Sequence, residues 1–216
     1  MNKRYRYWAP PTQRASGDLI PSRESAVLWL WERPQLLAWD RPLYWLFESN
    51  WHLWGIDAGG CLIIVDVTIA GSKTLQDPFG GLVAYARACS PGEWSAPELD
   101  VRWRDYLGSQ QDDVQRVVPP LVRPGYIRAV EHALAEREAA RNPLPTFVAL
   151  MGSRNSDLEY SEAGLKNKLL LENLVGAAKV RLRVISGTLD FKRLLVRSWS
   201  PGARTSIHWE RPYKSC

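Results

Sequence analysis

Cysteine, histidine and long apolar runs are all scarce in this sequence. The cysteines number three and lie far apart, at Cys61, Cys89 and Cys216, without a CxxC pair, which argues against a disulfide framework and a structural zinc site. The longest apolar run, Cys61–Val65, is much shorter than the roughly 18 to 20 residues of a membrane helix. No apolar segment of a secretory signal follows the basic start of the chain. These absences predict a protein of the reducing cytoplasm, without a membrane span.

The three histidines and the glycine-rich turns also lack the patterns of common active sites. His52, His132 and His208 are well separated and form no recognisable triad. The glycines match neither the phosphate-binding P-loop nor the dinucleotide-binding fingerprint. The sequence therefore does not support a P-loop nucleotide-binding enzyme or an enzyme that uses a dinucleotide cofactor.

The composition is that of one globular domain with basic ends. Hydrophobic residues make up 45% and charged residues 24% of the 216 residues, enough for one well-filled core. We expect an irregular basic arm over 1–21, a domain over 22–200 and a basic tail over 201–216. The net charge of +5 divides into +4 for residues 1–23, +7 for 179–216 and −6 for the remainder. Such ends could hold a polyanion, although they could equally be solvated tails.

Strand and helix patterns alternate along the chain. Residues 61–69 (CLIIVDVTI) have the apolar, β-branched character of a strand covered on both faces, and residues 57–60 have the chemistry of a tight turn. The other expected elements are strands or hairpin arms at 43–56, 146–151, 179–185 and 192–199, and helices from Ser22 to about Arg33 and at 77–88, 126–141 and 161–178. Residues 90–124 hold five prolines and predict an irregular excursion with one short helix at most. The pattern favours an α/β domain with a central mixed sheet flanked by helices.

Two aspartates mark the candidate chemistry. Asp66 and Thr68 are two residues apart in the expected strand and should share a face, and a tight hairpin should bring Asp57 beside them. Paired carboxylates suit Mg²⁺ or Mn²⁺, which can activate water against a phosphodiester. Asp57 could instead be an ordinary turn residue, whereas an unpaired carboxylate inside an apolar strand such as Asp66 is costly and more telling.

The order of these elements resembles the PD-(D/E)xK, or restriction-endonuclease-like, nuclease superfamily, particularly its NucS-like and RecB-like branches. The resemblance covers about residues 22–186 and is carried by Glu24, Ile56-Asp57, Asp66-Val67-Thr68 and the helix around Leu82 to Tyr85. It implies a magnesium or manganese ion held by Asp57 and Asp66, with assistance from Glu24. Thr68 stands where active members have lysine, and Lys73 is the candidate replacement.

Two functions follow as expectations. The first is a metal-dependent, endonuclease-like phosphodiesterase acting on DNA, with Asp57, Asp66, Lys73 and Glu24 as its catalytic residues. The alternative, favoured by Thr68, is a catalytically inactive nuclease-fold module that binds nucleic acid or a protein partner. A structural protein without enzymatic activity is a further possibility, in which Glu24 supports its own helix and Lys73 is a solvated loop residue.

Overall fold

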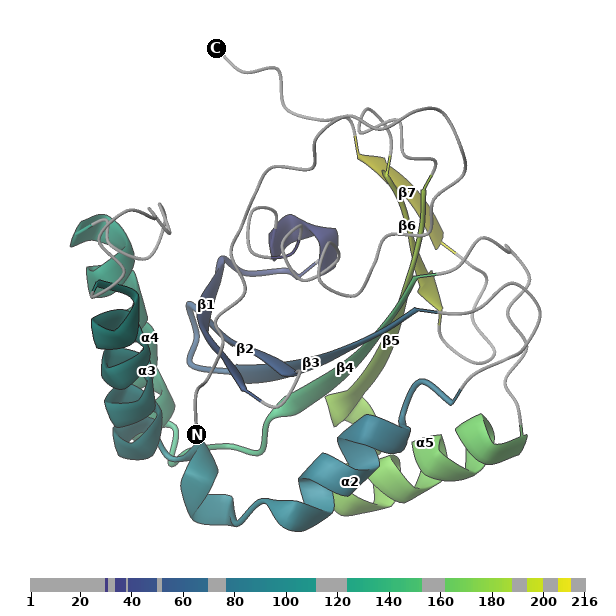
Figure 1. Ribbon diagram of the computed structural model, residues 1–216, viewed down its shortest axis with the longest axis horizontal. Coiled ribbons are helices and arrows are strands. Elements are labelled where there is room, and N and C mark those ends of the chain that lie inside the picture. The colour runs from purple at the N-terminus through teal and green to yellow at the C-terminus, as the bar shows by residue number, and fades with distance from the viewer. Residues whose placement is uncertain are drawn as a thin grey trace.

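A single mixed sheet of seven strands organises the protein. The computed structural model describes residue 30 and residues 34–37, 39–49, 52–69, 77–111, 124–152, 162–187, 194–199 and 206–210. Within these ranges the strands lie side by side in chain order (Figure 1). They are β1 (Leu43–Ser49), β2 (His52–Asp57), β3 (Leu62–Ile69), β4 (Thr146–Gly152), β5 (Val180–Gly187), β6 (Leu194–Trp199) and β7 (Ser206–Glu210).

The strand directions follow from the lengths of the connections. The neighbours β1, β2 and β3 form an antiparallel meander, and β5, β6 and β7 form another. Between the meanders, β3, β4 and β5 are parallel, and helices fill both crossover connections. As the tight hairpin predicts, the strand through Asp66 pairs antiparallel with the strand that ends at Asp57; it is an interior strand of the described sheet, third in the order.

The helices of the two crossovers pack on one face of the sheet. Both crossovers step in the same direction across the sheet, so the right-handed rule places their helices on the same side. The helices are α2 (Gly80–Ala88), α3 (Ala96–Gln111), α4 (Pro124–Ala139) and α5 (Glu162–Val175). Figure 1 shows α2 and α5 running together, and α3 and α4 standing as a pair beside β1. None of the described helices is both long and apolar enough to cross a membrane.

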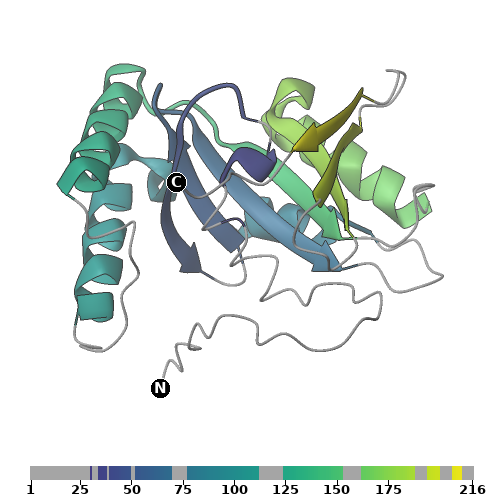
Figure 2. The same ribbon diagram turned by 90° about the horizontal axis from the view of Figure 1, so that it is seen from above.

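Each face of the sheet has its own buried core. The helix-covered face packs Leu82, Trp103, Val130 and Leu171 against side chains such as Trp54. The opposite face packs residues of β1 to β4 against Leu30, Leu37 and Trp39. The 3-10 helix η1 (Pro34–Leu37) lies over this second face, as both views show (Figures 1 and 2). The continuous apolar pattern of residues 61–69 is explained by these two cores, because alternate residues of β3 enter each of them.

Two segments differ from the sequence expectation. Residues 96–111 form the 16-residue helix α3, where at most a short helix was expected. The surrounding prolines hid an amphipathic pattern in which Leu99 and Trp103 are buried four residues apart, and Pro97 is tolerated because it lies in the first helical turn. Strand β7 lies within residues 201–216, the segment expected to be a basic tail, and pairs with β6.

A buried arginine ties three connections of the fold together. Arg137, on α4, is fully buried and donates hydrogen bonds to the carbonyl oxygens of Trp94 (2.8 Å), Gly60 (3.2 Å) and Pro143 (2.8 Å). Burial lowers the pKa of its guanidinium to about 10, so the group stays charged at neutral pH. The β2–β3 turn, the 3-10 helix η2 (Pro91–Trp94) and the loop before β4 are thereby held against α4.

We predict that Arg137→Met lowers the free energy of unfolding by roughly 3 kcal/mol or more, because three carbonyls lose their donors. Urea unfolding followed by circular dichroism measures the change. Arg128→Met, at an exposed position of the same helix, is the matched control and should change stability by less than about 0.5 kcal/mol. Equal effects of the two substitutions would contradict the role assigned to Arg137.

Candidate functional site

Asp57 has a structural task at the end of β2. Its Oδ1 accepts the backbone N–H groups of Gly59 and Cys61, both at 2.9 Å, and its Oδ2 accepts Trp39 Nε1–H at 2.9 Å. The first two bonds close the β2–β3 turn in the manner of an Asx turn. The third bond fixes the indole of Trp39, so both carboxylate oxygens are engaged by donors of the chain.

Asp66 lies in the middle of the fold, beneath the start of α2. It is buried in β3 directly opposite His52 of β2. A Cβ atom added to Gly81, in the first turn of α2, would be 2.4 Å from Asp66 Oδ2, so the carboxylate lies against the helix backbone. A negative charge is favourable at this end of a helix, where backbone N–H groups are unpaired within the helix.

The hairpin does not bring the two aspartates side by side as expected. The register pairs His52 with Asp66, whereas Asp57 lies beside the turn, five positions further along β2. At about 3.4 Å per residue, this places the two positions roughly 17 Å apart along the hairpin. Their side chains also lie on opposite faces of the sheet. The residues on either side of Asp66 in β3 enter the second core, so Asp66 is on the helix-covered face. The residue before Asp57 in β2 enters the helix-covered core, so Asp57 is on the second-core face.

A divalent cation does not fit Asp57 and Asp66 together. Mg²⁺ and Mn²⁺ require several oxygen ligands around one point, whereas these carboxylates lie on different faces and Asp57 already accepts three N–H donors. Across the described ranges, no three His, Cys, Asp or Glu side chains gather closely enough to hold a metal ion. Glu24 and Lys73, the other two expected catalytic residues, lie outside the described residues.

The structure groups Asp66 with His52, which the sequence analysis did not count among the site residues. The His52 ring packs against Tyr85 of α2, with centroids 4.8 Å apart and planes tilted by 40°, and Tyr85 meets Trp54 edge-on at 5.6 Å. Thr68 follows Asp66 on the same face of β3. If residue pairs are counted outward from the turn in the sequence, His52 falls opposite Asp66. The sequence therefore contained the information that these two residues are neighbours.

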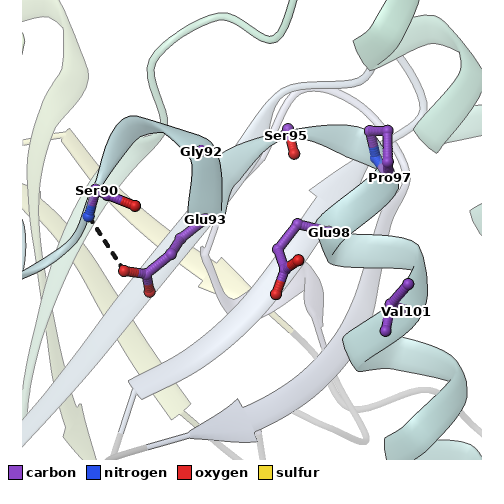
Figure 3. Close-up of a pocket in the computed structure, with 7 residues that line it drawn as sticks. All are labelled: Ser90, Gly92, Glu93, Ser95, Pro97, Glu98 and Val101. Carbon is purple, nitrogen blue, oxygen red and sulfur yellow. Dashed lines mark hydrogen bonds between the residues drawn. The ribbon is translucent and has the colours of Figure 1, made fainter.

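A shallow hollow of about 530 Å³ lies away from both aspartates. It is formed by η2 and the start of α3, and Figure 3 shows Glu93 and Glu98 directed towards it. One oxygen of Glu93 accepts the backbone N–H of Ser90 at 3.1 Å and so caps η2. None of the residues expected from the sequence to be catalytic lines this hollow.

We predict that Gly81→Ala destabilises the protein by about 1 to 3 kcal/mol, because the new methyl group would overlap the Asp66 carboxylate. Thermal or urea unfolding measures the loss. Gly108→Ala is the control: this helical glycine has open space around it, so alanine should stabilise by up to about 1 kcal/mol.

The clash with Asp66 can be isolated by a double-mutant cycle. In the Asp66→Ala background, Gly81→Ala should cost about 1 kcal/mol less than in the wild-type protein, because the opposing oxygens are gone. Additive effects would show that Gly81 is required for another reason.

No family model, no curated protein and no solved structure matches this chain. No activity can therefore be transferred from a relative. The function has to be inferred from the geometry of the chain itself, above all from the separation of Asp57 and Asp66.

Proposed function

We propose that this protein is a catalytically inactive module of the restriction-endonuclease-like fold that binds DNA. The observation that carries the proposal is the placement of Asp57 and Asp66 on opposite faces of the β2–β3 hairpin, with Asp57 engaged by three N–H donors. This argues against the two-carboxylate metal site that the resemblance implies.

The topology supports the choice of fold. An antiparallel meander (β1 to β3) is followed by helices, a strand parallel to β3, the helix α5 and the parallel strand β5. This is the order of elements that the nuclease superfamily has after its first helix. At the motif position two residues after Asp66 stands Thr68, which cannot supply the positive charge of the usual lysine.

The supporting evidence for a nucleic-acid partner is a basic surface built around Trp39. The Cζ atom of Arg181, at the start of β5, lies 4.2 Å from the centroid of the Trp39 ring. Arg41 reaches over the neighbouring turn, since a Cβ atom on Gly59 would be 1.7 Å from its Nη1. We call Trp39, Arg41 and Arg181 the Trp39 surface. Its arginines can contact phosphates, and the net charge of +5 favours a polyanion.

Asp57 acquires a role in this proposal. Its Oδ2 accepts the Trp39 indole N–H, and the turn that its Oδ1 closes lies against the guanidinium of Arg41. The carboxylate expected to hold a metal would then be a positioning residue for a DNA-binding surface. A protein partner with an acidic surface is the alternative occupant.

We predict no cleavage of single- or double-stranded DNA by the purified protein in Mg²⁺ or Mn²⁺. Incubation with supercoiled plasmid and labelled oligonucleotides, resolved on gels, measures it. Metal-dependent cleavage that disappears in Asp66→Asn but not in Asp57→Asn would contradict the inactive-module proposal. That result would instead favour a metal-dependent phosphodiesterase in which Asp66 is a metal ligand.

We predict that the wild-type protein binds duplex DNA with an affinity that falls steeply with salt. Arg41→Glu/Arg181→Glu should weaken binding at least tenfold and reduce the salt slope by about 2, because two phosphate contacts are lost. Fluorescence anisotropy at several salt concentrations measures both quantities.

Arg87→Glu/Arg128→Glu is the matched control, with the same change of charge at exposed positions on α2 and α4. Equal weakening by the control pair would show an unspecific charge effect. Failure of the wild-type protein to bind DNA at low salt would contradict the nucleic-acid partner and favour the protein-binding alternative.

A further inference from the structure

Gly59 leaves open the space that the guanidinium of Arg41 occupies. A Cβ atom at position 59 would lie 1.7 Å from Arg41 Nη1 and 2.9 Å from its Cζ, so a methyl group cannot share this space. Asp57 Oδ1 lies 3.4 Å from the same point, and it accepts the backbone N–H of Gly59. The guanidinium of Arg41 is therefore seated on the turn that Asp57 closes, directly against residue 59.

The backbone conformation does not require glycine at position 59. Of the glycines that the structure describes, Gly60 and Gly176 have a positive φ and Gly59 does not. Alanine would also keep the N–H that Asp57 accepts. The atoms that its methyl group would displace belong to the end of the flexible, exposed side chain of Arg41. Alanine at this position should therefore move Arg41 with little effect on folding.

The Arg41 guanidinium is positioned on the turn but has no acceptor there. Within the part of the chain that the structure describes, it donates no hydrogen bond and forms no ion pair. Two other arginines are already satisfied: Arg104 pairs with Asp100 and Glu131, and Arg137 donates to three carbonyl oxygens. The N–H donors of Arg41 are therefore open to an anion from outside the chain.

Asp57 links this arginine to the rest of the Trp39 surface. Its Oδ1 accepts the N–H of Gly59, against which Arg41 rests, and its Oδ2 accepts the indole N–H of Trp39. The ring of Trp39 in turn carries the guanidinium of Arg181. One carboxylate thus organises the supports of both arginines.

We propose that Gly59 is a positioning residue of the Trp39 surface: it lets the Arg41 guanidinium rest on the β2–β3 turn, where this group contacts a backbone phosphate of bound DNA. The inference rests on the proposed DNA-binding function, and it adds the chemical group that Arg41 recognises and the residue that places Arg41. A guanidinium matches two phosphate oxygens in a bidentate arrangement, which depends on its position as well as its charge.

The test compares Gly59→Ala, Arg41→Gln and the double variant by fluorescence anisotropy with a labelled DNA duplex at several salt concentrations. Arg41→Gln should weaken binding about threefold or more and reduce the salt slope by about 1, because one phosphate contact is lost. Gly59→Ala should weaken binding by a similar factor, although it leaves the net charge unchanged. In the Arg41→Gln background it should have no further effect, because the group that it displaces is gone.

Gly108→Ala is the matched control, since this exposed glycine of α3 has open space around it, and it should bind DNA like the wild type. Urea unfolding should give Gly59→Ala and the wild type the same midpoint, which separates a displaced arginine from a damaged fold.

The outcomes distinguish this inference from the proposed function. Wild-type affinity in Gly59→Ala, or an equal loss with and without Arg41, would overturn the positioning role and leave the DNA-binding function standing. Failure of the wild-type protein to bind DNA would overturn both. If Gly59→Ala fails to fold, Arg41→Gln decides, and an unchanged affinity and salt slope in that variant would overturn the inference.

Discussion

The arrangement of the hairpin and the helices depends on the desolvated guanidinium of Arg137. A fully buried cation costs several kcal/mol unless its donors are satisfied, and here three backbone carbonyls satisfy them. The contact requires glycine at position 60, where φ is +78° and a Cβ atom would be 2.4 Å from the backbone N of Arg137. The turn, α4 and the entry to β4 are consequently fixed relative to one another. The hairpin register that separates Asp57 from Asp66 starts from this anchored turn.

The two faces of the hairpin perform different tasks because of that register. On the second-core face, Asp57 organises the turn and Trp39, and Arg181 covers the ring of Trp39. On the helix-covered face, Asp66 lies at the start of α2 among aromatic side chains. Two carboxylates of the same residue type, nine positions apart, thus have unrelated environments. Side chains that are close in sequence need not be close in space, because successive residues of a strand point to opposite faces of the sheet.

Tryptophan side chains fill much of both cores and connect the sheet to the helices. Trp45, Trp54 and Trp103 are fully buried and fill large parts of the two cores. Trp45 packs across Gly55, where any larger residue would collide with its ring. The backbone carbonyl of Trp45 accepts a hydrogen bond from the Tyr126 hydroxyl of α4 at 2.8 Å. This contact is close to the irregularity in the register of β1. Aromatic packing therefore joins the sheet to the helices, and it also supplies the rings that hold Arg102 and Arg181.

The sequence alone determined the α/β class, the strand at 62–69 and its antiparallel pairing with β2, because a continuous β-branched run and a tight-turn signal are local and strong. It did not reveal α3 or β7, since prolines obscured the first and short, charged segments resemble tails. It singled out Asp57 and Asp66 as candidate site residues. Only the tertiary structure decided the surroundings of the two carboxylates. The register placed them on opposite faces of the sheet. Asp57 is contacted by Trp39 and Asp66 lies beside Gly81, both of which are distant in sequence. Such contacts depend on packing between elements, which no local pattern encodes.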